Sequence, residues 1–579
     1  MRQVLTGAIG ARGMALGRAR RVQTTDVRID PTPLANAEVD GELQRLHQAL
    51  ESAREELLAL RDKLQGSMAR EATEFVDAHS MLLSDPDLLR GLNAMIRDEH
   101  MRAGAALKAQ RDRLAGVFEA MDDPYLRSRS EDIDQVIGRV QSILARKSSP
   151  EERKLASRVG EILVAETIAP GDLASLAGRG LLGAITASGS AYSHSAILAR
   201  NLNLPMLIGV ASALGTIRDN DLVLLDGETG ELIVHPAAQD LARYRRWQRA
   251  TTREGKRLAA LANAPTRTHD GVDIRLYANA EQAGDLATAR ATGASGIGLY
   301  RSEFLFLQQK GLPSEDEQFG AYRNLVLGMG GLPVTIRTLD LGADKAGNAG
   351  LTVRGEENPA LGVRGIRLSL RHPVIFATQL RAILRAASYG PVRILIPMVT
   401  QIDEIDAVRT LVDHCARDLR NEGEDPPDNL DIGAMIEVPA AALTVRHLLK
   451  HADFLALGTN DLAQYVLATD RNNDALGNLY NPLQPALLRL IHHVISAANH
   501  AGKPVCLCGE MAGDPLFTPL LLALGLTDFS MHPGQLLAVR DRIGSLEHAR
   551  LRRLAPRILR AGSCDEVEAI VRQGMPATA

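Results

Sequence analysis

The 579-residue sequence is short of aromatic residues, of cysteine and of long apolar runs. Aromatic side chains make up 3% of the chain, with a single tryptophan, which argues against the stacking platforms that bind single-stranded nucleic acid. The formal net charge is −4 and the basic residues are dispersed, so we predict no nucleic-acid partner. No uninterrupted apolar run reaches membrane-spanning length, so we predict no membrane insertion.

The chain has only four cysteines, and their spacing is irregular. Cys415, Cys506, Cys508 and Cys564 are too few for a disulfide framework, which fits a reducing compartment. The N-terminal residues lack the apolar core of a signal peptide. We therefore predict a cytoplasmic protein of ordinary composition, with 45% hydrophobic and 23% charged residues.

The length allows about three or four domains, and the residue pattern changes along the chain accordingly. Residues 1–23 and 147–236 combine short apolar runs with glycine turns, which predicts an α/β domain. Residues 24–146 carry apolar side chains three and four positions apart, which predicts an inserted helical subdomain. Residues 237–262 predict a polar, arginine-rich helix, which we interpret as a connector between domains.

Residues 263–579 carry the clearest pattern, in which short strand candidates alternate with helical stretches. Eight such repeats over about 270 residues are typical of a (β/α)8 or TIM barrel, in which functional residues lie at the carboxyl ends of the strands. The fold class predicted for the whole chain is therefore multidomain α/β. The predicted barrel strands are Ile274–Ala278, Gly296–Tyr300, Val334–Thr338, Arg393–Pro397, Gly433–Glu437, Phe454–Leu457, Val505–Cys508 and Phe529–Met531.

His194 stands between two serines in the segment Gly189–Arg200, directly before a run of good helix formers. The small and polar residues before it allow a tight turn and a close approach to a ligand. In the first turn of a helix, free N–H groups and the helix dipole favour an anion and keep an imidazole neutral. Such a histidine is suited to accept a phosphoryl group. The alternative is a histidine that only bonds the backbone at a helix start.

Charged and polar side chains gather at the ends of the predicted barrel strands. They are Arg301, Glu303, Arg337, Asp340, Glu437, Asn460, Asp461, Arg471, Cys508 and Glu510. Buried charges are costly unless paired, and the planar fork of arginine matches phosphate and carboxylate groups. Glu437 and Asp461 offer hard oxygens suited to Mg²⁺, which takes its remaining ligands from water and substrate. The pattern predicts a small anionic substrate that is both phosphorylated and carboxylated.

Structural alternatives stay open for several of these residues. Arg301 and Arg337, each with a carboxylate two or three positions later, also fit structural ion pairs. Cys506 fits a small, buried apolar residue. Cys508 lies nearer the strand end and is a candidate proton donor, a role that the sequence alone does not establish.

Two long motifs make this chain resemble a known family. Residues 193–200 read Ser-His-Ser-Ala-Ile-Leu-Ala-Arg, and residues 457–465 read Leu-Gly-Thr-Asn-Asp-Leu-Ala-Gln-Tyr. Shorter segments at 301–305, 356–359 and 508–510 support them. In this order and separation, the chain is similar nearly end to end to enzyme I of the bacterial phosphoenolpyruvate:sugar phosphotransferase system.

The resemblance implies a phosphoenolpyruvate–protein phosphotransferase in which His194 attacks the phosphorus of phosphoenolpyruvate and the enolate of pyruvate leaves. Arg301 and Arg337 match the positions that hold the phosphoryl group and neutralise its developing charge. The remaining substrate-binding positions of the family match Asn460, Arg471 and Arg364.

The resemblance also implies a metal ion and a proton donor. Glu437 and Asp461 match the ligands of Mg²⁺, the implied cofactor. Cys508 matches the residue that protonates the enolate carbon. Ser302 replaces a usual threonine beside Arg301, and none of the departures from the family pattern removes a group that this chemistry requires.

The family further implies a protein partner and a moving histidine. The phosphoryl group passes to a histidine of the small carrier protein HPr, for which residues 24–146 form the dock. The helix at 237–262 is expected to be a hinge, because one histidine must reach both the barrel and the carrier. A homodimer through residues 263–579 is also implied.

There are three alternatives to this function, two of them enzymes and one a binding protein. Pyruvate phosphate dikinase and phosphoenolpyruvate synthase share these domains but add a large nucleotide-binding domain, for which residues 1–150 are too few and too helical. A nitrogen-branch paralogue of enzyme I, acting on an HPr-like protein, typically carries a sensory domain that this sequence lacks. A non-catalytic regulatory binder is the third, and the intact set of predicted site residues argues against it.

Overall fold

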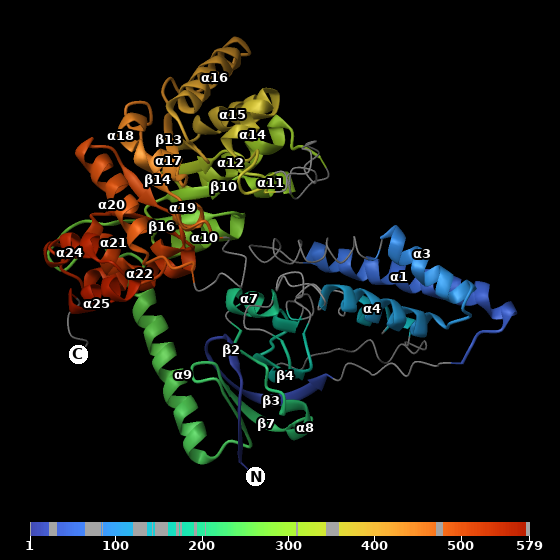
Figure 1. Ribbon diagram of the computed structural model, residues 1–579. Helices are drawn as coiled ribbons and strands as arrows, with labels where there is room; N and C mark the ends of the chain where they lie inside the picture. Colours follow the sequence, from blue (N-terminus) through green and yellow to red (C-terminus); the bar gives the residue numbers. More distant parts are fainter. Residues whose placement is uncertain are drawn as a thin grey trace. The chain divides into compact units, whose positions relative to one another are not determined.

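The computed structural model forms two compact units, residues 1–253 and 254–579 (Figure 1). None of the described helices is both long and apolar enough to cross a bilayer. The residues that the structure describes are 2–22, 32–63, 83, 85–119, 136–141, 143–144, 160–168, 173, 176–189, 194–202, 204–307, 311–342, 358–469 and 479–574.

An eight-stranded mixed sheet organises the first unit, in the order β1-β8-β7-β3-β4-β5-β6-β2. Strands β3 to β6 run parallel, and the other pairs are antiparallel. The strands are β1 Gln3–Thr6, β2 Ala8–Ala11, β3 Met14–Val22, β4 Glu161–Ala165, β5 Gly183–Thr186, β6 Met206–Ile208, β7 Leu222–Asp226 and β8 Glu231–Val234. Strands β7 and β8, near the end of this region, pair directly as a hairpin.

Apolar side chains alternate across the sheet and bury both of its faces. Leu163 of β4 belongs to a core cluster with α7 (His194–Asn201), whereas Ile162 belongs to one with α8 (Ala213–Thr216). The inserted region is helical where it is described, with η1 Asn36–Glu38, α1 Val39–Lys63, α3 Pro86–Arg97 and α4 Ala103–Glu119. Its own core is formed by side chains such as Leu46, Leu92, Ile96 and Leu107.

Helix α9 (Ala238–Ala259) contains the boundary between the units, which falls after Arg253. Near its start, Asp240 accepts hydrogen bonds from the Arg2 guanidinium at 2.7 and 3.0 Å and from the Ala237 N–H at 2.9 Å. Trp247 and Tyr244 pack on the sheet residues Met14, Leu224 and Ile233. Near its end, Arg257 pairs with Asp541 of the second unit.

A closed barrel of eight parallel strands organises the second unit, and all eight predicted strands are confirmed. The fold class predicted from the sequence is therefore confirmed. The strands are β9 Arg275–Ala280, β10 Ile297–Arg301, β11 Val334–Arg337, β12 Val392–Ile396, β13 Asp431–Ile436, β14 Leu455–Leu457, β15 Val505–Leu507 and β16 Asp528–Met531.

Helices follow the strands around the barrel (Figure 1). They are α10 Ala283–Ala291, α11 Glu303–Leu307, α12 Glu315–Met329, α14 Ile366–Arg371, α15 Pro373–Ala387, α16 Ile402–Asn421, α17 Pro439–Leu443, α18 Val445–Leu448, α19 Thr459–Leu467, α20 Pro485–His500, η3 Glu510–Ala512, α21 Thr518–Leu524, η4 Pro533–Gln535, α22 Leu536–Gly544, α23 His548–Arg552, α24 Ala555–Arg560 and α25 Cys564–Gly574.

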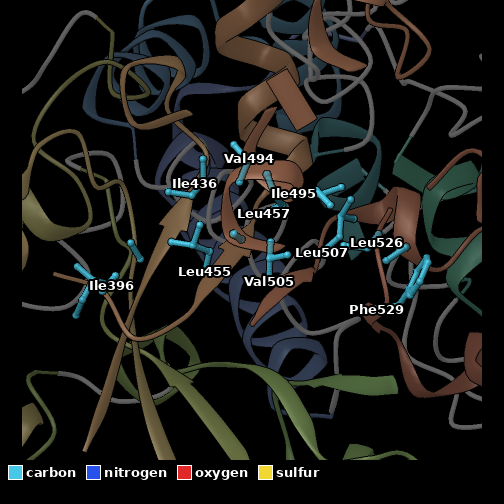
Figure 2. Packing of buried hydrophobic residues seen from close by; sticks show 14 of the residues in the cluster. Ile396, Ile436, Leu455, Leu457, Val494, Ile495, Val505, Leu507, Leu526 and Phe529 are labelled. Atoms are coloured by element: carbon cyan, nitrogen blue, oxygen red, sulfur yellow. The ribbon is translucent and has the colours of Figure 1, made fainter. Parts of the chain in front are cut away.

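Successive strand residues face opposite sides of the barrel wall. Ile436, Leu457 and Leu507 belong to the large cluster packed against the helices, together with Val494 and Ile495 of α20 (Figure 2). A separate cluster contains residues that alternate with these along the strands. Its members are Leu299, Leu395, Met435, Phe454, Ala456 and Cys508. The packed wall leaves the carboxyl ends of the strands as the platform for functional side chains.

Candidate active site

In the first unit, α7 begins at His194 and is fixed on the sheet by its neighbours. The Ser195 hydroxyl donates to the Ile168 carbonyl at 2.5 Å, and the Arg200 Nε donates to the Gly10 carbonyl at 2.8 Å. Ala199, on the same helix, is buried in the core. The backbone of His194 therefore lies where a helix leaves N–H groups free for an anion. Its side chain, with Ala169, Ser190, Tyr192 and Arg471, lies outside the described part of the chain.

In the second unit, the described site residues follow the carboxyl ends of barrel strands. Arg301 and Arg337 are the last residues of β10 and β11, and Glu437 directly follows β13. Asn460 and Asp461 lie in the first turn of α19, after β14. Cys508 follows β15, and Arg364 precedes α14. Because parallel strands of a closed barrel end at one mouth, these side chains share it.

Arg337 is nearly buried between two carboxylates. Its Nη2 lies 3.0 Å from Glu303 Oε1, and its Nη1 lies 3.0 Å from Asp340 Oδ2. Burial alone lowers the pKa of Arg337, but the nearby carboxylates outweigh it and raise the pKa above its ordinary value. The buried Nε has no hydrogen-bond partner among the described residues. A buried donor without a partner favours a nearby anionic oxygen.

The structural alternative in which Arg301 pairs with Glu303 is not what the structure shows. Arg301 donates instead to Glu281, which follows β9, at 2.5 Å. Glu303 turns to Arg337, and its Oε1 also accepts the backbone N–H of Asp340 at 2.9 Å. The expected pair of Arg337 with Asp340 is present. The carboxylates thus tie neighbouring strand ends together, and they hold the arginine forks in place.

Arg364 links two carboxylates of the mouth. Its Nη2 lies 3.1 Å from Asp340 Oδ2 and 3.7 Å from Asp461 Oδ2, and its Nη1 donates to the Tyr465 hydroxyl at 3.4 Å. Burial lowers the pKa of Arg364, but Asp340 and Asp461 raise it above the ordinary value overall. Arg364 is therefore a permanent cation at the site.

Glu437 and Asp461 fit a Mg²⁺ ion. Glu437 is 1% exposed, and burial, followed by the charges of Asp340 and Asp461, raises its pKa to about 8. A cation would relieve this excess of negative charge. A Cβ on Gly458 would lie 2.8 Å from Glu437 Oε2, so glycine keeps space open at that oxygen. No described cluster of three or more acidic, histidine or cysteine side chains forms a metal cage.

Cys508 is a buried, protonated thiol. Burial, and then the charge of Glu437, raise its pKa to about 12. Its Sγ lies 3.4 Å from the Leu457 carbonyl, to which it donates. Nearby, the Asn460 side chain donates to Glu510 Oε1 at 3.1 Å and accepts the Glu510 N–H at 3.0 Å, which fixes its amide. The mouth thus combines cations, hard oxygens, an oriented amide and a proton source.

Sequence reasoning missed several supporting residues. Glu281 carries no motif of its own and was found only through its bond to Arg301. Met398 has a left-handed backbone, with φ of 57°, and its N–H donates to Glu437 Oε1 at 2.7 Å. Gln379 is 1% exposed on α15, and a polar residue on the apolar face of a helix is a signal that could have found it.

Comparisons with known families place this geometry in a class. A domain described as "PEP-utilising enzyme, PEP-binding domain" matches residues 255–548, which cover the barrel. The N-terminal domain of the PEP-utilising enzymes matches residues 6–129, and their mobile domain matches residues 158–230. A closed barrel whose mouth gathers arginines and carboxylates, preceded by these two domains, defines an enzyme that uses phosphoenolpyruvate.

Full-length relatives narrow the class. The chain is 43% identical over 582 residues to a phosphoenolpyruvate-protein phosphotransferase of Cupriavidus necator, covering 98% of this chain and 99% of that protein. It is 37% identical to that of Geobacillus stearothermophilus, covering 99% and 98%. A solution structure titled as enzyme I is 29% identical, covers 43% of this chain and 99% of its own, and has a TM-score of 0.37. The chain belongs to the phosphoenolpyruvate-protein phosphotransferase family, the enzymes I.

Proposed function

We propose that this enzyme I carries the phosphoryl group of phosphoenolpyruvate through His194 to a histidine of an HPr-type carrier protein, as the first step of sugar uptake. The observation that supports it best is the barrel mouth, where Arg337 offers a buried, unpartnered Nε between fixed carboxylates. The mouth binds and activates a phosphorylated acid but holds no described histidine nucleophile. The nucleophile comes from the start of α7 in the other unit.

Each mouth residue then has a role in the transfer. His194 attacks phosphorus, the bond from phosphorus to the enol oxygen breaks, and the electron pair leaves on the enolate of pyruvate. Arg301 and Arg337 hold the phosphoryl oxygens and neutralise the charge that develops on them. The substrate is oriented by Asn460, Arg364 and Arg471.

The enolate that remains needs a proton at its terminal carbon. The thiol of Cys508 is protonated throughout the neutral range, because its pKa is raised to about 12. It is the proton donor that converts the enolate to pyruvate. Glu437 and Asp461 would hold Mg²⁺, which supplies positive charge to the substrate oxygens when bound.

The other regions serve transfer to the carrier. The helical subdomain at 24–146 docks HPr, and the connector at 237–262 is the hinge through which His194 visits the barrel and then the carrier. The α/β domain, at 1–23 and 147–236, carries the phosphohistidine. The barrel domain at 263–579 binds phosphoenolpyruvate and forms a homodimer.

Labelling with ³²P-phosphoenolpyruvate and Mg²⁺ tests this function. We expect acid-labile, base-stable label on the wild-type protein and on His235→Ala, a matched histidine variant in the same unit. We expect no label on His194→Ala, whose affinity for phosphoenolpyruvate, measured by calorimetry, stays within about threefold because its barrel is intact. Label that persists on His194→Ala would refute the assignment of the nucleophile.

A further inference from the structure

We propose that Gln379 is a positioning residue for Arg337, acting through a buried polar network behind the barrel mouth. This inference rests on the proposed role of Arg337 in holding the phosphoryl group. Gln379 belongs to α15, an outer helix of the barrel, and is distant in sequence from every residue that the motifs identify. It acts through the backbone on either side of Thr338.

Three hydrogen bonds fix the Gln379 amide. Its Oε1 accepts the N–H of Leu339 at 3.0 Å. Its Nε2 donates to the Ser302 hydroxyl at 3.0 Å and to the Tyr322 hydroxyl at 3.1 Å. Ser302 in turn donates to the carbonyl of Arg337 at 2.7 Å. One side chain therefore holds the peptide groups just after β11 from both sides, one directly and one through Ser302.

The groups at the two ends of this network decide which atom donates and which accepts in each of its hydrogen bonds. The carbonyl of Arg337 can only accept, so Ser302 must donate to it and must itself accept from Gln379. At the other end, Gln318 donates to the Pro313 carbonyl at 3.0 Å, which turns its Oε1 toward the Tyr322 hydroxyl at 3.3 Å. Tyr322 therefore donates to Gln318 and also accepts from Gln379. A single arrangement of protons satisfies the chain, so the amide has one orientation.

Burial makes this arrangement hard to replace. Ser302 and Tyr322 are 0% exposed, and Gln318 and Gln379 are 1% exposed. Water therefore cannot readily take the place of a lost partner, and the loop would shift to find another. Ser302 also lies directly after Arg301, so its bond to the Arg337 carbonyl ties the ends of β10 and β11 together.

The effect on chemistry follows from the position of Arg337. Its guanidinium bonds to Glu303 and Asp340, and the Asp340 N–H bonds to the same Glu303 carboxylate. If the backbone between Arg337 and Leu339 were free to shift, the Arg337 guanidinium would move relative to the phosphorus. Small misplacements of a group that stabilises the transition state lower the rate more than they lower ground-state binding.

The test is single-turnover pyruvate formation by the full-length protein with Mg²⁺ and varied phosphoenolpyruvate. For Gln379→Met, which keeps the length of the side chain but loses all three bonds, we expect the maximal rate to fall about 10- to 100-fold. The concentration for half-maximal rate should change less than about threefold. Ser302→Ala, which removes one of the links to Arg337, should have an effect of the same kind but smaller.

Tyr322→Phe separates positioning from stability. It removes a buried hydroxyl at the far side of the network and should lower the melting temperature, yet the maximal rate should stay within about threefold because both links to the Arg337 segment remain. A Tyr322→Phe rate that falls as far as that of Gln379→Met would overturn the positioning role, as would a Gln379→Met rate equal to wild type.

Arg337→Lys is assayed beside these variants. If the maximal rate falls in Arg337→Lys but stays at the wild-type value in Gln379→Met, only the positioning role of Gln379 is wrong. If Arg337→Lys keeps the wild-type rate, the proposed function of Arg337 is wrong, and the inference about Gln379 fails with it.

Discussion

At the barrel mouth, Arg337 lies between Glu303 and Asp340, which come from the ends of different elements. Further buried side chains behind them fix the backbone that follows Arg337. Helix α7, as far as its surroundings are described, is held by hydrogen bonds from the Ser195 hydroxyl and from the Arg200 guanidinium. The two arrangements fit the two tasks that we propose for them. Activation of a substrate requires many groups that are fixed in advance. A nucleophile that must reach both the substrate and a carrier requires one accessible group on a firmly packed helix.

Of the substitutions that test this comparison, those of Arg337 at the barrel mouth should have the largest effect on rate and stability. Arg337→Lys keeps the charge but loses the fork, so we expect the maximal rate of pyruvate formation to fall about 100- to 1,000-fold. Arg337→Met should also cost about 3–5 kcal/mol of unfolding free energy, because Glu303 and Asp340 would be left buried without a partner. Single-turnover kinetics and urea unfolding measure the two effects.

Arg381 provides a matched control for that prediction. It also pairs with two carboxylates, Glu315 and Glu422, each at 2.6 Å, but on the outer helices. Arg381→Met should leave the rate unchanged and cost about 1 kcal/mol or less, since Glu422 is largely exposed. A loss of rate as large as that of Arg337→Lys would show that the mouth has no special role.

The next largest effect should come from the proton donor. Cys508→Ala should slow pyruvate formation by about 10- to 100-fold, while phosphorylation of His194 slows less, because protonation follows phosphoryl transfer. Quenched-flow measurement of both products separates the two steps. Cys415→Ala is the control, since Cys415 is also buried and its pKa is also raised, to about 11, but it lies on α16. Equal slowing in both variants would contradict the assignment.

The smallest effect should come from the first unit. Asp240→Ala removes a carboxylate that accepts from Arg2 and from the N–H of Ala237, just before α9, so we expect a loss of about 1–2 kcal/mol of unfolding free energy for that unit and no change in the affinity of the barrel for phosphoenolpyruvate. Asp273→Ala, which breaks an exposed pair with Arg267, should leave the unfolding free energy almost unchanged, because solvent screens this pair. An unfolding free energy equal to wild type in Asp240→Ala would contradict this stabilising role.

The sequence was enough to predict the barrel and the polar residues at its strand ends, because apolar strand runs and the polar residues after them are local signals. The pairing of those residues was not local. The sequence allowed an ion pair between Glu303 and Arg301, two positions away, but Glu303 bonds Arg337 of the next strand. The hydrogen-bond network of Gln379 could not be predicted from the sequence for the same reason, because its partners come from several separate elements. Local patterns indicate which groups are present, and tertiary packing decides which of them meet.

Helix α9 has one further consequence. Its first half is attached to the sheet through Asp240 and Trp247, and its end is attached to the barrel unit through Arg257. Residues 248–253 between these anchors are exposed, and no side-chain bond or ion pair is recorded for them within this described helix. A change of backbone torsion in that short stretch would therefore break none of the anchoring contacts. Within the helix itself, such a change would break backbone hydrogen bonds, which water can replace in an exposed stretch.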